Sequence, residues 1–158
     1  MAKRYWLFKS EPDTFSIDDL QRAPKGVAVW DGVRNYQARN MLRDIIKVGD
    51  EVFFYHSRVQ PPGIAGICRV VREGFPDKSA LELSSQYYDP KVHSDKPVWY
   101  AVEVQFVLKL PKIIPLEVLK KTPGLQKMMV TRKGNRLSIQ PVTSEEWKII
   151  MVLMKNYR

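Results

Sequence analysis

Residues 98 to 110, VWYAVEVQFVLKL, restrict the possible folds of this chain more than any other segment. Apolar side chains recur there at every second position, and Glu103, Gln105 and Lys109 stand between them. A period of two is typical of a β-strand with one buried face, and it does not fit an amphipathic helix. We therefore predict a long, half-buried antiparallel strand. Its apolar positions are Val98, Tyr100, Val102, Val104, Phe106, Leu108 and Leu110.

Shorter apolar runs predict five further strands. Turn-forming residues separate the third of these runs from the fourth, in the sequence RVQPPG. The predicted strands are RYWLFKS (4–10), VAVW (27–30), DEVFFYHS (50–57), GIAGICRVV (63–71) and RLSIQPVT (136–143).

Helix signals lie between these strands. Ser16, followed three residues later by Asp19, is typical of an N-cap and predicts a helix of two turns. A second helix is expected from about Asn35 to near Gly49. Its predicted buried stripe is Ala38, Leu42, Ile45 and Ile46, and its predicted basic face is Arg39, Arg43 and Lys47.

The last part of the chain is also predicted to be helical. Residues 115–128 favour a pair of short helices, and Thr143 with Glu146 forms a capping box that opens a terminal helix. The expected buried stripe of that helix is Trp147, Ile150, Met151 and Met154. Six strands with helices inserted between them, and without βαβ regularity, indicate an α+β protein built on a small mixed barrel.

The length and the composition exclude several classes of protein. A chain of 158 residues has the size of one domain. It has no apolar run of the ~20 residues that span a bilayer, and no signal-peptide pattern, so we expect an intracellular protein without membrane contact. Cys68, among apolar neighbours, is expected to be a buried thiol. Two separated histidines and one cysteine predict no metal site, and no cofactor is expected.

Basic residues are concentrated in the last third of the chain. Residues 109–158 contain 11 Lys or Arg against 3 acidic residues, whereas residues 1–108 contain 15 against 14. Such clustering favours a polyanionic partner, and a solvated basic face without a partner is the alternative.

Seven stretches of the sequence carry a family resemblance. They are YWLFKSEP (5–12), WDGVRNYQARN (30–40), VFFYHS (52–57), PGIAGICRVV (62–71), YYDP (87–90), VEVQFV (102–107) and RLSIQPVT (136–143). In this order they resemble the EVE domain, a branch of the PUA-like superfamily that includes the thymocyte nuclear protein family and is distantly related to the YTH and ASCH domains. The resemblance covers nearly the whole chain, apart from segment 123–135. It implies a single EVE domain over residues 1–158, with a PUA-like mixed β-barrel of about five to six strands.

The resemblance also implies a pocket that binds a modified base of DNA or RNA, such as 5-methylcytosine, without changing it chemically. A base removed from the duplex needs flat apolar surfaces, and each aromatic stack contributes ~1 to 3 kcal/mol. Trp30 is expected to form one wall, and Tyr87 or Tyr88 the other. The sequence pattern alone favours a core position for Trp30, and only the resemblance favours the pocket.

Polar groups must then recognise the edge of the base. Ser10 and Asn35 are expected to supply hydrogen bonds, although Asn35 serves equally well as a helix cap. His56 is placed at the pocket floor, with a core histidine as the alternative. Tyr36 and Tyr55 complete the predicted pocket. Asp31 and Gly32 are interpreted as turn residues.

The phosphate backbone requires positive charge outside the pocket. The residues predicted to bind it are Lys9, Arg34, Arg39, Arg43, Arg132 and Lys133. The expected partner is therefore DNA or RNA carrying a modified base, and a monomer is favoured.

Two other functions remain open. Some ASCH relatives are amidohydrolases that act on modified nucleosides, and Lys9, Ser10 and Glu11 could form an active site of that kind. In a strand, however, Ser10 points away from both neighbours, and His56 and Ser57 point to opposite faces, so no nucleophile and base are paired. The third possibility is a basic interaction module without a ligand pocket.

Overall fold

The chain forms a six-stranded mixed sheet that curls into an open barrel, in a computed structural model that describes residues 3–158. The strands are β1 (Tyr5–Ser10), β2 (Val27–Trp30), β3 (Glu51–His56), β4 (Gly63–Pro76), β5 (Tyr100–Pro115) and β6 (Ile139–Val142). Their order is β2-β5-β4-β3-β1-β6. Among the described residues β1 and β3 form the one parallel pair, with Trp6 opposite Val52. The α+β class and the six strands are confirmed, and within residues 3–158 β2 and β6 are not paired, so the barrel stays open on one side.

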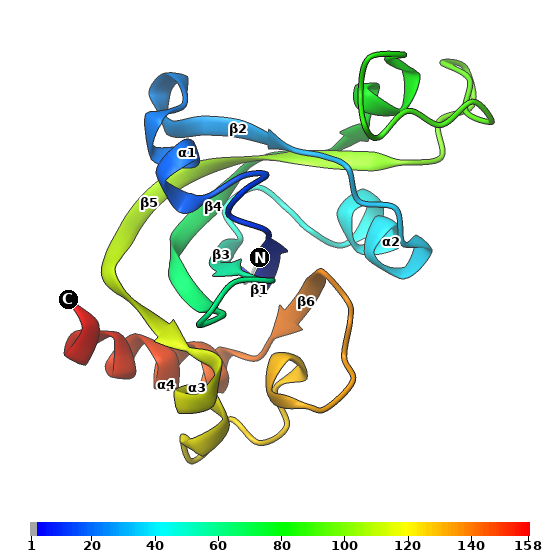
Figure 1. Ribbon diagram of the computed structural model, residues 1–158. Helices are drawn as coiled ribbons and strands as arrows, with labels where there is room; N and C mark the ends of the chain where they lie inside the picture. Colours follow the sequence, from blue (N-terminus) through cyan, green and yellow to red (C-terminus); the bar gives the residue numbers. More distant parts are fainter. Residues whose placement is uncertain (1–2) are drawn as a thin grey trace.

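The two longest strands give the sheet its curvature. β5 begins at Tyr100 and continues to Pro115, five residues beyond the predicted end, and β4 continues to Pro76. Register shifts interrupt their pairing, and such bulges bend a strand and increase its twist. At Gly66 a Cβ atom would lie 2.3 Å from the carbonyl oxygen of Leu108, so the close approach of the two strands requires glycine. Figure 1 shows β5 curving around the interior from segment 77–99 to α3.

The helices fill the connections between strands. They are α1 (Ile17–Arg22), α2 (Tyr36–Asp44), α3 (Leu116–Lys121) and α4 (Ser144–Met154). Both predicted N-caps are confirmed, since the Ser16 hydroxyl accepts a hydrogen bond from the Asp19 amide at 3.1 Å, and the Thr143 hydroxyl accepts one from the Glu146 amide at 3.1 Å. Of the predicted terminal stripe, three residues are buried and Met151 is half-buried.

Two helix predictions are wrong in extent. α2 ends at Asp44, because the amides of Ile45 and Ile46 both donate to the Met41 carbonyl and close the helix. Lys47 therefore lies beyond α2 and does not continue its basic face. The predicted helix pair is α3 alone, followed by turns and a short 3-10 helix at Met129–Thr131.

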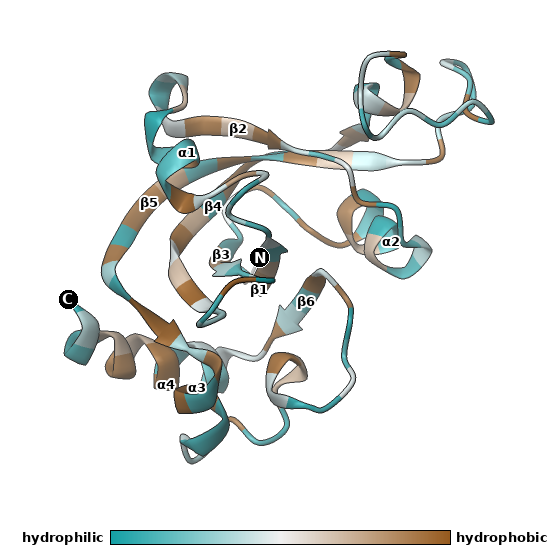
Figure 2. Cartoon of the chain, in the orientation of Figure 1, coloured by the Kyte–Doolittle hydropathy of each residue, from teal (hydrophilic) through white to brown (hydrophobic). Residues whose placement is uncertain are grey.

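The sheet separates two apolar cores. One lies between the sheet and α1 and α2 and contains Trp6, Phe8, Trp30 and Phe54. The other lies beneath α3 and α4 and contains residues of the opposite strand face, such as Leu7. Figure 2 shows apolar residues spread along the curved strands. Cys68 is fully buried in the first core, as predicted, and burial raises the pKa of its thiol.

Candidate functional site

A cleft of about 470 Å³ lies on the open side of the barrel, between the end of β2 and the ends of β1 and β6. It gathers residues from four separate parts of the chain. The lining residues are Lys9, Ser10, Glu11, Thr14, Phe15, Val29, Trp30, Asp31, Gly32, Val33, Arg34, Gln86, Tyr87 and Ser138. Of the eight residues predicted to bind a base, the cleft brings together Ser10, Trp30 and Tyr87.

Trp30 belongs to the core and also lines the cleft. Its side chain is 7% exposed, and its ring centre lies 5.2 Å from those of Phe8 and Phe54. Phe15, which also lines the cleft, packs edge-on against Trp30 at 6.2 Å. The core position of Trp30 is therefore confirmed, and its stacking on a base stays a prediction.

Tyr87 enters the cleft from the long connection between β4 and β5. Its ring lies against Gly32, where a Cβ atom would stand 2.5 Å from the Tyr87 Cζ atom. Gly32 has a φ of +77°, a conformation that favours glycine, so the turn residue also makes room for the ring. Burial raises the pKa of the Tyr87 hydroxyl further above neutral pH, where a phenol is protonated in any case and can donate a hydrogen bond.

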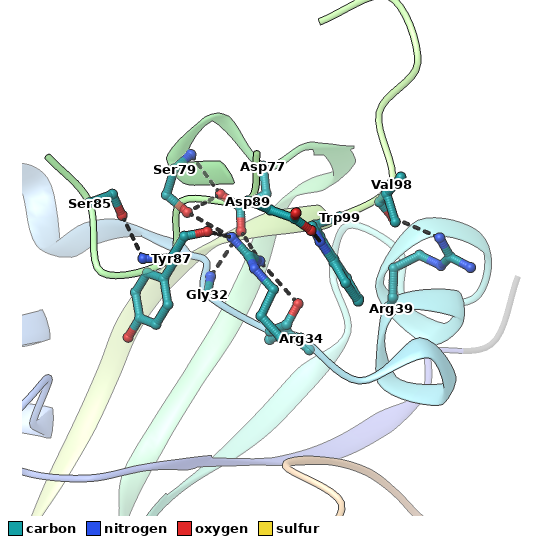
Figure 3. Close-up of polar contacts among 11 residues, drawn as sticks. Gly32, Arg34, Arg39, Asp77, Ser79, Ser85, Tyr87, Asp89, Val98 and Trp99 are labelled. Carbon is teal, nitrogen blue, oxygen red and sulfur yellow. Dashed lines mark hydrogen bonds and ion pairs between the residues drawn. The ribbon is translucent and has the colours of Figure 1, made fainter. Parts of the chain in front are cut away.

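Arg34 is held inside a network of side chains (Figure 3). Its Nη1 atom lies 2.9 Å from the Asp77 Oδ2 atom, and its Nη2 atom donates to the Tyr87 carbonyl at 2.7 Å. The same Asp77 oxygen accepts a hydrogen bond from the Gly32 amide at 2.9 Å. Burial alone would raise the pKa of Asp77, but the hydrogen bonds from Ser79, Gly32 and Arg34 hold it below its ordinary value.

Besides Arg34, three charged residues line the cleft. Burial, together with the nearby Asp77, raises the pKa of the Asp31 carboxyl. Burial lowers the pKa of Lys9, whose Nζ atom lies 3.5 Å from the Asn135 carbonyl oxygen. Glu11 follows the last residue of β1, so it lies outside the strand and lines the cleft together with Lys9 and Ser10. The strict alternation predicted for these three residues thus ends at Ser10.

Asn35 and Tyr36 lie outside the cleft lining. The Asn35 side chain accepts a hydrogen bond from the Ala38 amide at 3.0 Å and caps α2, the second of its two predicted roles. Tyr36 is 61% exposed and packs against Trp99, with ring centres 4.9 Å apart. A contact of either residue with a base stays a prediction.

The other three predicted pocket residues are also absent from the lining. The His56 Nε2 atom accepts a hydrogen bond from the Ile17 amide at 3.1 Å, and burial lowers the pKa of His56, as expected for a core histidine. Tyr55 is buried in the second core, where burial raises its pKa to about 12. Tyr88 is 40% exposed, and its neighbour Tyr87 is the tyrosine that faces the cleft.

Most of the predicted phosphate ligands have partners within the chain. The Arg39 guanidinium donates to the Val98 carbonyl at 2.7 Å, and Arg43 pairs with Asp44 at 2.8 Å. Arg132 donates to the Lys127 carbonyl at 2.6 Å. Within residues 3–158, no hydrogen bond or ion pair engages the side chain of Lys133, which is exposed.

Several residues of the cleft were not predicted from the sequence. Phe15, Gln86 and Ser138 line it, although none of them was assigned to the predicted site. Ser138 lies in a stretch that resembles the EVE domain, which was the one available signal. Phe15 and Gln86 stand in loops, where no periodicity shows the direction of a side chain.

Two negative findings hold for the described residues. Between residues 3 and 158, no three His, Cys, Asp or Glu side chains are grouped in a way that could hold a metal ion. No helix in the same range has the length and the apolar character needed to cross a membrane.

The comparison with protein families decides the identity of the fold. A model of the EVE domain matches residues 4–153. The chain belongs to the EVE domain family. Mouse thymocyte nuclear protein 1 is 47% identical to this EVE domain over 165 residues, which cover 94% of the chain and 73% of the relative. The predicted resemblance is thereby confirmed.

Solved structures agree with this assignment. A protein from Pseudomonas syringae has 49% sequence identity and a TM-score of 0.90, over 95% of this EVE domain and 99% of that chain. Human THYN1, solved in complex with DNA containing 5-methylcytosine, has 44% identity and a TM-score of 0.88, over 97% of this chain and 98% of that one. A YTH domain from Zygosaccharomyces rouxii, 13% identical with a TM-score of 0.56, shares the fold alone.

Proposed function

We propose that this EVE domain binds DNA that carries a modified base, and that it holds the base in the cleft without changing it chemically. The observation that carries this proposal is the cleft lined by Phe15, Trp30 and Tyr87 in a chain so similar to human THYN1. That relative was solved in complex with DNA containing 5-methylcytosine.

The shape and the lining of the cleft suit a single extruded base. A volume of about 470 Å³ lies within the range of ~300 to 1,000 Å³ that is usual for small-ligand sites. The rings of Trp30 and Tyr87 provide apolar surface to replace the stacking that the base loses. Asp31, Ser10 and Gln86 add polar groups that can hydrogen-bond its edge.

The phosphates are proposed to bind beside the Ser138 end of the cleft. Lys133 and Arg136 are exposed, precede Ser138 closely in the sequence, and have no partner within residues 3–158. These side chains are therefore available for phosphates, unlike the guanidinium groups of Arg34, Arg43 and Arg132. Phosphate contacts of this kind increase affinity without regard to base sequence.

A catalytic function is less well supported by the cleft. The Ser10 hydroxyl donates a hydrogen bond to the Phe15 carbonyl at 2.6 Å, and the cleft lining contains no histidine to activate it. His56 is buried, and its Nε2 atom is occupied by the Ile17 amide. Lys9 and Glu11 are the side chains in the cleft that would suit an amidohydrolase.

A panel of oligonucleotides tests the proposal. DNA and RNA strands with 5-methylcytosine, 5-hydroxymethylcytosine, N6-methyladenine or no modification are titrated, and binding is followed by intrinsic Trp fluorescence. We expect tighter binding of at least one modified DNA strand. Equal affinity for all strands would contradict the proposal and favour the basic interaction module.

The same samples test the enzymatic alternative. The protein is incubated with modified nucleosides and with the modified oligonucleotides, and the mixtures are analysed for product. Multiple turnover that disappears in Lys9→Ala or Glu11→Gln would replace the binding function with hydrolysis.

A further inference from the structure

The connection from β4 to β5 carries its own small core and reaches the cleft through Tyr87. Ala80, Val92 and Trp99 pack together in this segment, and the Trp99 indole donates to the Asp89 carboxylate at 2.9 Å. Tyr87 is thus the point at which segment 77–99 contributes an aromatic ring to the cleft lining.

Arg34 joins this segment to the turn that follows β2. Its guanidinium group lies 5.6 Å from the Tyr87 ring centre and 5.3 Å from the Trp99 ring centre. It also donates hydrogen bonds to the Val33 carbonyl, the Asp77 carboxylate, the Ser79 hydroxyl and the Tyr87 carbonyl. Figure 3 shows Arg34 among these partners, with Tyr87 on one side and Trp99 on the other.

These contacts occupy most of the hydrogen-bonding capacity of Arg34. A guanidinium group has five N–H donors, and the Arg34 side chain directs four hydrogen bonds to protein acceptors. The Asp77 carboxylate, with a side chain 1% exposed, already balances its charge. A phosphate would have to compete with these four protein acceptors.

We propose that Arg34 is a positioning residue, which fixes the Tyr87 ring against Gly32 and so keeps one aromatic wall of the cleft formed before any ligand arrives. The effect of Arg34 on DNA binding rests on the proposed function. Its effect on the position of the Tyr87 ring does not, because that position can be measured in the free protein. This role differs from the phosphate contact predicted from sequence.

Lysine cannot replace arginine in this network. An ammonium group is a compact charge without the planar fork that reaches Asp77 and the Tyr87 carbonyl together, and it lacks the flat surface with which a guanidinium group contacts aromatic rings. Arg34→Lys therefore keeps the charge but releases the segment that carries Tyr87. Arg43→Lys is the matched control, because Arg43 pairs with Asp44 on the exposed surface of α2.

The first test uses the free protein. Because the Tyr87 ring lies against Gly32, its ring current should shift the Gly32 Hα resonances in an NMR spectrum. Replacing Tyr87 by Ala identifies that shift by removing it. Arg34→Lys should reduce the shift toward the Tyr87→Ala value, and Arg43→Lys should leave it unchanged. Asp77→Asn, which keeps an acceptor for the Gly32 amide and removes the charge partner of Arg34, should act like Arg34→Lys.

The second test measures binding in a double-mutant cycle. Tyr87→Ala should weaken binding of the preferred modified strand by roughly 5-fold to 150-fold, the range expected for one aromatic stack. Arg34→Lys should cause a loss within that range and leave the unmodified strand nearly unaffected. In the Tyr87→Ala background, Arg34→Lys should add little, because it acts through Tyr87.

Several results would overturn the inference. One is a Gly32 shift that survives in both Arg34→Lys and Asp77→Asn, and another is a full additional loss from Arg34→Lys in the Tyr87→Ala background. Equal weakening of modified and unmodified strands with a smaller salt dependence would make Arg34 a phosphate ligand. If the wild-type protein does not distinguish the strands, the proposed function fails, and the NMR comparison still decides the role of Arg34.

Discussion

Replacing Trp30 by Ala should destabilise the protein more than it weakens ligand binding. The Trp30 side chain is 7% exposed and packs against the rings of Phe8, Phe15 and Phe54. Removing a buried aromatic side chain of this kind costs ~3 to 5 kcal/mol, because the surrounding rings relax only partly into the cavity. In a chain of 158 residues a loss of ~1 kcal/mol lowers Tm by ~2 to 4 °C, so a decrease of roughly 6 to 20 °C is expected.

Tyr87→Ala is the matched comparison for this prediction. Tyr87 is half-buried and belongs to neither of the two main cores, so its removal should lower Tm much less. Thermal unfolding is followed by circular dichroism, and affinities are measured below the transition of each variant. Trp30→Phe should restore most of the stability, since it keeps an aromatic ring among the same neighbours.

One result would refute this account of Trp30. In that result Trp30→Ala unfolds within ~2 °C of the wild type, which corresponds to at most ~1 kcal/mol, and still loses discrimination for the modified strand. Trp30 would then act as a wall of the cleft and contribute little to the stability of the core. A large drop in Tm with discrimination retained in the folded fraction would place the whole effect in the core.

Three further predictions concern pH, the turn at Gly32 and the phosphate contacts. Burial holds the pKa of His56 below its ordinary value of 6.5. The contribution of the neutral His56 to stability should therefore be fully present above pH 6.5 and decline as the pH falls from 6.5 toward the folded-state pKa. Thermal melts at about pH 7.5 and about pH 5 should show this decline in the wild type but less of it in His56→Gln. Gly32→Ala should weaken binding of the modified strand selectively because its Cβ atom would displace the Tyr87 ring, whereas Gly49→Ala, also at positive φ but with nothing within 4 Å, should only reduce Tm. Lys133→Glu and Arg136→Glu should weaken modified and unmodified strands alike, and titrations between ~50 and ~200 mM salt should show a smaller slope of log K against log salt, by ~0.9 for each lost phosphate contact.

Local patterns predicted the elements of the fold. The strand at residues 98–110 was recognised from apolar residues at every second position, and the caps at Ser16 and Thr143 from a partner residue three positions later. Both signals lie within a few residues of each other in the chain, so both can be recognised in sequence. The curvature of β4 and β5 could not be predicted, because their bulges arise from contacts between strands. Likewise, α2 was predicted too long because Ile45 and Ile46 continue its apolar stripe although their amides already close the helix.

The cleft was predicted less completely than the fold. Ser10, Trp30 and Tyr87 were found through stretches that resemble the family, whereas Asn35, predicted with them, caps α2 outside the cleft lining. The role of Arg34 depends on Asp77, which lies 43 residues away and which no spacing rule connects with it. Sequence could therefore propose aromatic residues for the site, but it could not show which of them share a cleft.

The pairing of β1 with both β3 and β6 also determines when the cleft can form during synthesis. Lys9 and Ser10 are synthesised well before Ser138, and β6 is the strand that covers the outer edge of β1. At ~5 to 20 residues per second, roughly 3 to 10 s pass on the ribosome between Tyr87 and Ser138. During that interval the aromatic residues of the site exist without the strand that completes their surroundings. Until β6 is made, a nascent chain leaves one edge of β1 unpaired beside Phe8 and Trp30, and such an edge is a surface suited to chaperones.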